Sequence, residues 1–144
     1  MRRLLVIVLL LCLVAPARPA SQEVVLVVRV DSPVTDLDSV SVRKLFLGLP
    51  VLVNGTPLHP LRNRSEPLLD EIFLQNIVAM SKSSYDRQVL IGVNRQLALR
   101  PPELTSAAEV VAAVSADPNA VSFMWQREVG HNPRIRVIRV LWSD

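Results

Sequence analysis

The stretch EVVLVVRV, from Glu23 to Val30, decides the fold class of this chain. Six of its eight residues are valine or leucine, and they do not alternate with polar residues. A strand with one face in water alternates apolar and polar side chains, whereas a continuous apolar run is typical of a strand covered on both faces. The stretch therefore predicts a buried strand in the sheet of an α/β domain.

Helical patterns follow this strand. Residues 39–48 (SVSVRKLFLG) place apolar side chains at helical spacing and end at Gly48, a residue type that commonly terminates helices. A helix is predicted from Ser65, because apolar residues at positions 69, 72, 73, 77 and 80 form one stripe. A shorter helix is predicted at residues 83–92 and another at 106–115. Each begins with a serine followed three positions later by an acidic residue, which is the capping-box spacing.

The remaining patterns indicate strands and loops. A short strand is predicted around Leu58–Leu61, and its prolines favour the edge of a sheet. Residues 97–104 (LALRPPEL) are interpreted as a loop. Residues 120–125 (AVSFMW) and 134–142 (RIRVIRVLW) predict two closing strands around a turn at 130–133. The chain is therefore expected to be a single α/β layer domain with strands first and last.

The first twenty residues, MRRLLVIVLLLCLVAPARPA, have the pattern of a signal peptide: two arginines, an apolar run, then small residues and prolines. The apolar run is shorter than the about 20 residues that cross a bilayer, so no retained membrane span is expected. Cleavage after Ala17 fits the small-residue rule, and cleavage after Ala20 is the alternative. The expected organisation is a signal peptide at 1–17 and one domain at 18–144.

Removal of the signal peptide changes the charge. The full chain has 16 basic and 13 acidic residues. Cleavage after Ala20 removes Arg2, Arg3 and Arg18, which leaves 13 basic against 13 acidic residues. A neutral chain gives no reason to expect nucleic acid as a partner. The only cysteine, Cys12, leaves as well, so the exported protein would depend on its apolar core for stability.

Three motifs carry a resemblance to a known family: RKLFLGLP at 43–50, VNGTPLHPL at 53–61 and DPNAVSFM at 117–124. The chain from about Val24 to Leu141 resembles the second lobe of periplasmic phosphate-binding proteins of ABC transporters, and the short single-lobe proteins related to them. The resemblance implies an α/β fold that is a single lobe of the type II periplasmic binding protein fold, with a mixed sheet flanked by helices.

The resemblance also implies a ligand site. In the two-lobed proteins a helix that begins Ser-Gly-Thr, with an arginine upstream, holds phosphate through backbone N–H groups and hydroxyls, as helix N-termini generally do for anions. Ser65 takes the place of that serine, and Arg62 or Arg64 that of the arginine, while Glu66-Pro67 replaces Gly-Thr. The candidate anion-binding residues are therefore Arg62, Arg64 and Ser65.

A simpler interpretation of the same residues stays open. Ser65 would be the N-cap of the helix, and the arginines would be solvated or paired with Glu66 and Asp70. No metal site is expected, because His59 and His131 have no ligand-spaced partner. No catalytic site is expected, because Ser65, His59 and Asp70 have the residue types of a triad but no nucleophile-elbow pattern surrounds Ser65. No cofactor is expected either.

The function expected from these patterns is that of a non-enzymatic, solute-binding-like module in the periplasm, with phosphate or another small anion as its ligand. The alternative is a protein-interaction or assembly subunit of the cell envelope that has lost ligand binding. The expected partners are accordingly a small anion, an envelope protein or a second copy of the chain.

Overall fold

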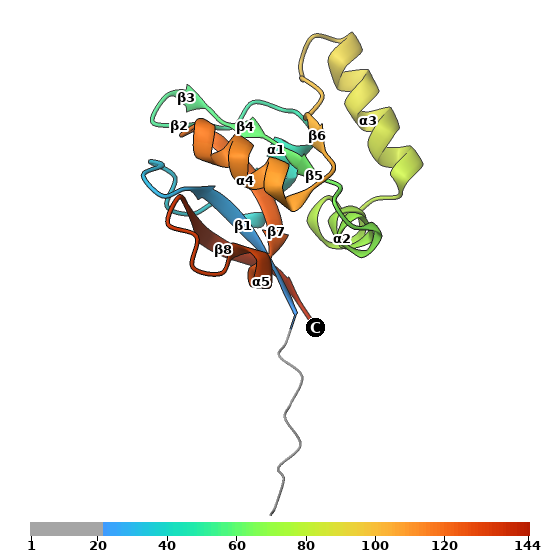
Figure 1. Ribbon diagram of the computed structural model, residues 1–144. Helices are drawn as coiled ribbons and strands as arrows, with labels where there is room; N and C mark the ends of the chain where they lie inside the picture. Colours follow the sequence, from blue (N-terminus) through green and yellow to red (C-terminus); the bar gives the residue numbers. More distant parts are fainter. Residues whose placement is uncertain (1–21) are drawn as a thin grey trace, which may run out of the picture.

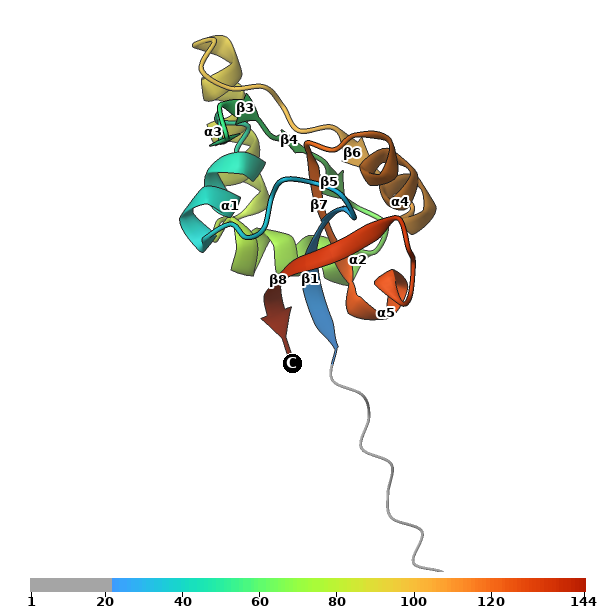
Figure 2. The ribbon, with the colours of Figure 1, turned by 90° about the vertical axis from the view of Figure 1, so that its left-hand side faces the viewer.

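The computed structural model describes residues 22–144, so the predicted signal peptide and its cleavage after residue 17 or 20 lie outside the described residues. The described chain forms a mixed sheet with helices on both faces (Figure 1, Figure 2). The main sheet has the strand order β4-β7-β1-β8. Its strands are β4 (His59–Pro60), β7 (Ala120–Trp125), β1 (Glu23–Arg29) and β8 (Ile135–Ser143). β4 runs parallel to β7, whereas β1 is antiparallel to both of its neighbours.

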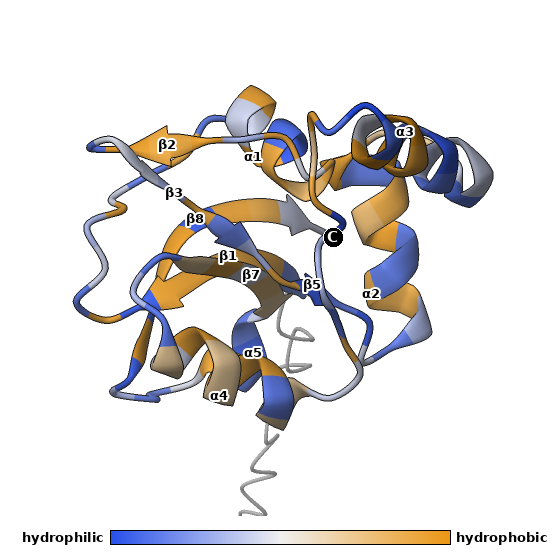
Figure 3. Cartoon of the chain, turned by 90° about the horizontal axis from the view of Figure 1, so that it is seen from above, coloured by the Kyte–Doolittle hydropathy of each residue, from blue (hydrophilic) through white to orange (hydrophobic). Residues whose placement is uncertain are grey.

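Strand β1 lies in the middle of the sheet, which confirms the prediction from its apolar run. Residues Val24 to Val28 are 0% exposed. Val24 pairs with Trp125 of β7 on one side and with Trp142 of β8 on the other. Both faces of the strand are covered, because alternate residues of β1 belong to the two separate apolar clusters of the core. Figure 3 shows the apolar colour along β8 and much of β1.

The helices divide between the two faces of the sheet. On one face lie α1 (Ser39–Phe46), α2 (Pro67–Ile72), the π-helix η1 (Phe73–Ile77) and α3 (Lys82–Asn94). On the other face lie α4 (Ala107–Ala116) and α5 (Gln126–Val129). The larger cluster is built around aromatic rings, with Phe73 stacked on Phe123 at a centroid distance of 5.1 Å. The smaller cluster packs Val110 and Val114 of α4 on β1.

The predicted edge strand near Leu58–Leu61 is present, and it changes partner along its length. The N–H of Leu61 donates to the carbonyl of Val121 in β7, and the N–H of Arg62 donates to the carbonyl of Pro102 on the other side. The segment therefore continues as β5 (Arg62–Asn63), which pairs in parallel with β6 (Glu103–Leu104). The interpretation of 97–104 as a loop was wrong for β6, whose two residues are too few to show a strand pattern. A small hairpin of β2 (Leu52–Val53) and β3 (Thr56–Pro57) precedes this segment.

The predicted helices are present, but some of their boundaries differ. Helix α4 begins after Ser106, whose side chain accepts from the N–H of Glu109 as predicted. Helix α3 was expected to be short and capped by Ser83. It has 13 residues, and its N-cap is Ser81, whose side chain accepts from the N–H of Ser84. The stripe that begins at residue 69 spans α2 and η1 rather than one continuous α-helix. Helix α5, with four residues, was not expected at all.

Gly48 at the end of α1 provides a test of the local packing. A Cβ atom at this position would lie 2.0 Å from the carbonyl oxygen of Leu99, and the φ angle is +81°. Gly55 has a similar φ of +78°, but nothing lies within 4 Å of its Cβ position. We expect Gly55→Ala to cost about 1 kcal/mol in free energy of unfolding from left-handed strain alone. Gly48→Ala should cost clearly more in urea unfolding; equal losses would contradict the close approach of Leu99.

Candidate anion site at the start of α2

Arg62 is a buried charge in the described structure. Its side chain is 2% exposed, and its Nη2 donates to Asp70 Oδ1 at 2.7 Å. Its Nη1 donates to Glu103 Oε1 at 3.3 Å. The guanidinium carbon lies 4.6 Å from the ring centroid of Phe73 and 4.7 Å from that of Tyr85. The positive charge is therefore held between two carboxylates and two aromatic rings rather than presented to solvent.

Arg64 joins the same network from the surface. Its Nη1 donates to Glu103 Oε2 at 2.9 Å, and its Nε lies 3.6 Å from Asp70 Oδ1. The hydrogen bond to Glu103 raises the pKa of Arg64 above its usual value. Two arginines thus face two carboxylates, and the network is formally neutral. The expectation that the arginines pair with Asp70 is confirmed, whereas Glu66 does not bond to either of them.

The prediction that Ser65 is the N-cap of the helix was wrong. The N-cap is Glu66, with φ −140° and ψ 142°, and Pro67 is the first helical residue, where proline is favoured. The backbone N–H of Ser65 donates to Asn63 Oδ1 at 2.9 Å, which holds this residue in the turn before the helix. Its hydroxyl oxygen is buried and has no hydrogen-bond partner among the described residues.

Acidic side chains surround the helix start. Glu66 Oε2 accepts from Trp125 Nε1 at 3.0 Å and lies 3.5 Å from Arg127 Nη2. Burial, and then the negative charge of Glu66, raise the pKa of Glu128 above its usual value. A carboxyl group whose pKa is raised in this way reports an environment that disfavours negative charge. The region where the resemblance implies an anion is therefore occupied by the chain's own carboxylates.

The structure brings the three predicted residues together on one segment, from β5 to the start of α2. Sequence reasoning missed Asn63, Glu103 and Glu128. Asn63 is 0% exposed, and its Nδ2 donates to the carbonyl of Phe123, so it fixes β5 against β7. Glu103 is distant in sequence, and no local pattern connects it with Arg62.

Residues 22–144 contain neither a cluster of metal-ligating side chains nor a membrane-spanning helix. No group of three histidine, cysteine, aspartate or glutamate residues is placed to hold a metal ion in this part of the chain. His59 instead pairs with Asp117, with 2.6 Å between Nδ1 and Oδ2. No helix in the same range is long and apolar enough to cross a membrane.

Comparison with known proteins identifies the fold. No protein-family model matches the sequence, and no curated protein matches it either. Solved structures do match. One is a protein of Clostridium perfringens assigned as a phosphate ABC transporter substrate-binding protein, with bound phosphate. It is 14% identical, with a TM-score of 0.60 over 83% of this chain and 45% of that chain. Another is an ABC-type phosphate transport receptor from Vibrio cholerae, 17% identical, with a TM-score of 0.53 over 83% and 46%.

These matches confirm the predicted fold class. The mixed sheet with helices on both faces is the fold of the matched part of phosphate ABC transporter substrate-binding proteins. The chain spans slightly less than half the length of each matched structure, as expected for a single lobe. The similarity at these identities concerns the fold, and the ligands of the matched proteins remain properties of those proteins.

The two arginines make a matched pair for mutation. Arg62→Ala removes a buried partner of Asp70 and Glu103, and we expect it to lower the free energy of unfolding by about 3 kcal/mol. Arg64 is 37% exposed and lies at the edge of the same network. Its replacement by alanine should cost about 0–1 kcal/mol, as for other surface pairs. Urea unfolding measures both values, and equal costs would show that burial does not set the strength of the network.

Proposed function

We propose that this chain is an exported, non-enzymatic module that works in the periplasm as a solute-binding-like lobe. The shared fold carries the proposal, because both matched proteins are phosphate transport components built on it. The basic start, short apolar run and small-residue exit of the first twenty residues support export. The chain would act by binding a solute rather than by converting it.

In this proposal the contact for a small anion lies at Arg62, Arg64 and Ser65. The arginines stand before the start of α2, where the free N–H groups of a helix favour negative charge. Asp70 and Glu103 already neutralise both arginines, and Glu66 adds a negative charge at the N-cap. An anion would therefore compete with the chain's own carboxylates, and we infer weak binding by the isolated chain.

The second candidate is a protein-interaction or assembly subunit of the cell envelope that has kept the lobe and lost the ligand. The internal pairing of Arg62 and Arg64 favours it, because residues used for tight anion binding would be left free to meet the anion. Binding of small anions by the purified protein supports the first candidate. Stable co-purification with one envelope protein, without anion binding, supports the second.

Calorimetry with phosphate and sulfate tests the inferred weakness. We expect little or no heat from the native protein. A Glu66→Gly, Pro67→Thr double variant removes one negative charge and supplies an N–H that proline lacks, so it should gain measurable affinity. Glu71→Gln is the matched control, because it removes one negative charge from the exposed side of the same helix. Tight binding by the native protein, lost in Arg64→Ala, would overturn the inference.

A second test concerns the missing wall of the site. Solute sites commonly enclose about 70–90% of their ligand, and a single lobe offers only one side of such a site. We therefore expect tight anion binding to require a second copy of the chain or a partner, with Ser65 facing the joint. Sedimentation velocity with and without phosphate measures the assembly state. A protein that remains monomeric and yet binds phosphate with micromolar affinity would contradict this expectation.

A further inference from the structure

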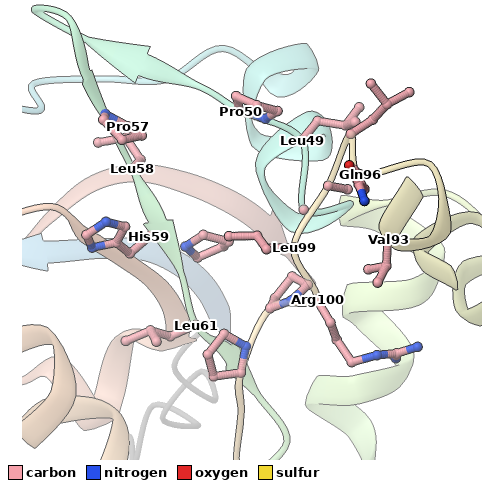
Figure 4. Close-up of a pocket in the computed structure, with 16 residues that line it drawn as sticks. Leu49, Pro50, Pro57, Leu58, His59, Leu61, Val93, Gln96, Leu99 and Arg100 are labelled. Carbon is pink, nitrogen blue, oxygen red and sulfur yellow. The ribbon is translucent and has the colours of Figure 1, made fainter. Parts of the chain in front are cut away.

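A hollow in the described part of the molecule lies apart from the candidate anion site. Its volume is about 680 Å³, and none of Arg62, Arg64 and Ser65 lines it. One wall is the strand segment 57–61, the other is the loop 96–102, and residues 48–50 lie between them (Figure 4). We call this hollow the proline groove, because Pro50, Pro57, Pro60, Pro101 and Pro102 all line it. Its volume falls within the about 300–1,000 Å³ that is common for ligand sites.

Backbone contacts give the proline groove a defined shape. The N–H of Leu99 donates to the carbonyl of Gly48 at 3.0 Å, which fixes the loop wall to the end of α1. On the strand wall the N–H groups of His59 and Leu61 are already bonded to the β7 side. The prolines have no N–H to offer. A bound segment would therefore have few backbone donors to pair with, and its apolar side chains would supply most of the contact.

Exposed apolar side chains extend the surface of the groove. Leu99 is 82% exposed and Leu97 is 60% exposed, and both line the groove. Val93 also lines it from α3, and Leu90 lies one turn earlier on that helix with 51% exposure. Single exposed leucines are ordinary, but a group of them beside a concave apolar site is typical of a binding surface.

The acidic groups next to the groove are paired within the chain: Asp117 with His59, and Glu103 with Arg62 and Arg64. Residues 87–102 contain three arginines, at positions 87, 95 and 100, and no acidic residue. No residue that lines the groove is acidic, and Arg95 and Arg100 form no ion pair with any described residue. The acidic residue of α3, Asp86, is bonded to Lys82 at 2.8 Å, and this bond, with a smaller contribution from the charge of Arg100, lowers the pKa of Asp86. Figure 4 shows the side chain of Arg100 pointing away from the strand wall, so its charge lies beside the hollow rather than inside it.

We propose that the proline groove binds a segment of a partner protein whose apolar side chains enter the hollow and whose flanking Asp or Glu side chains pair with Arg95 and Arg100. The concave, mostly apolar hollow can receive inserted side chains, as ligand sites commonly do. The positive charge selects an acidic segment, because complementary charges at the rim of an interface guide association and exclude wrong partners. The inference rests on the interaction function proposed above and does not depend on anion binding at Ser65.

Selection from a library of displayed random peptides tests the proposal. The bait is the native protein, and the counter-bait is a Leu97→Asp, Leu99→Asp variant, whose changes lie on exposed side chains and whose fold is checked by circular dichroism. We expect the enriched peptides to combine an apolar centre with acidic flanks. Failure to enrich any peptide over the counter-bait, or enrichment of peptides with basic flanks, would overturn the proposal.

Affinities of the selected peptide then test the charge contribution. The Arg95→Glu, Arg100→Glu variant should bind it at least tenfold more weakly, and added salt should weaken native binding in the same direction. Arg134→Glu is the matched control, since this exposed arginine of the turn before β8 also forms no ion pair with a described residue. If Arg134→Glu weakens peptide binding as much, the loss in the Arg95→Glu, Arg100→Glu variant does not come from these two arginines, and their part in the proposal is wrong.

Binding to vesicles that contain the anionic lipid phosphatidylglycerol tests whether the groove meets a membrane instead of an acidic protein segment. Vesicle binding that the Leu97→Asp, Leu99→Asp variant loses, without any peptide binding, would assign the surface to a membrane and overturn the proposal. Phosphate calorimetry on the same variant should match the native result. Failure of the groove is thereby distinguished from failure of the proposed interaction function, which co-purification of the native protein with an envelope protein decides.

Discussion

The arrangement of the candidate site depends on the burial of one guanidinium. Arg62 lies on β5, and its partners Asp70 and Glu103 lie on α2 and β6, so a single side chain connects three elements. Removing such a charge from water is costly, and the cost is offset only while both carboxylates remain in place. The rings of Phe73 and Tyr85 close the remaining sides. The arginine is therefore part of the structure of the lobe before any ligand is considered.

This use of Arg62 changes what the helix start can do. A helix that offers free N–H groups and a nearby free arginine attracts an anion. Here the arginines are neutralised, and Glu66 stands at the N-cap with its carboxylate bonded to Trp125. The N-terminal end of α2 favours a nearby negative charge, and the carboxylate of Glu66 already supplies it. The lobe shares the fold of the matched phosphate transport proteins, while the charged groups at the start of its α2 are paired within the chain.

The sequence predicted a helix or strand correctly where the residues of that one helix or strand carry the signal. The apolar run of β1 and the serine cap of α4 were read correctly, because strand burial and helix capping leave their signal in adjacent residues. The start of α2 was misplaced by one residue, since Pro67 at the first helical position moved the cap from Ser65 to Glu66. The burial of Arg62 could not be predicted, because its partner Glu103 is 41 residues away and meets it only through the pairing of β5 with β6.

The central position of β1 also sets the order in which the molecule can assemble. Both neighbours of β1 come from the far end of the chain: Val24 pairs with Trp125, and Glu23 pairs with Ser143. The first strand therefore cannot pair until a partner about a hundred residues further along the chain has been brought to it. Closing a loop of that length slows folding. Until then the strand is an unpaired, aggregation-prone segment. The last strand of the chain completes the cover of the first, so folding can finish only when the whole chain is available.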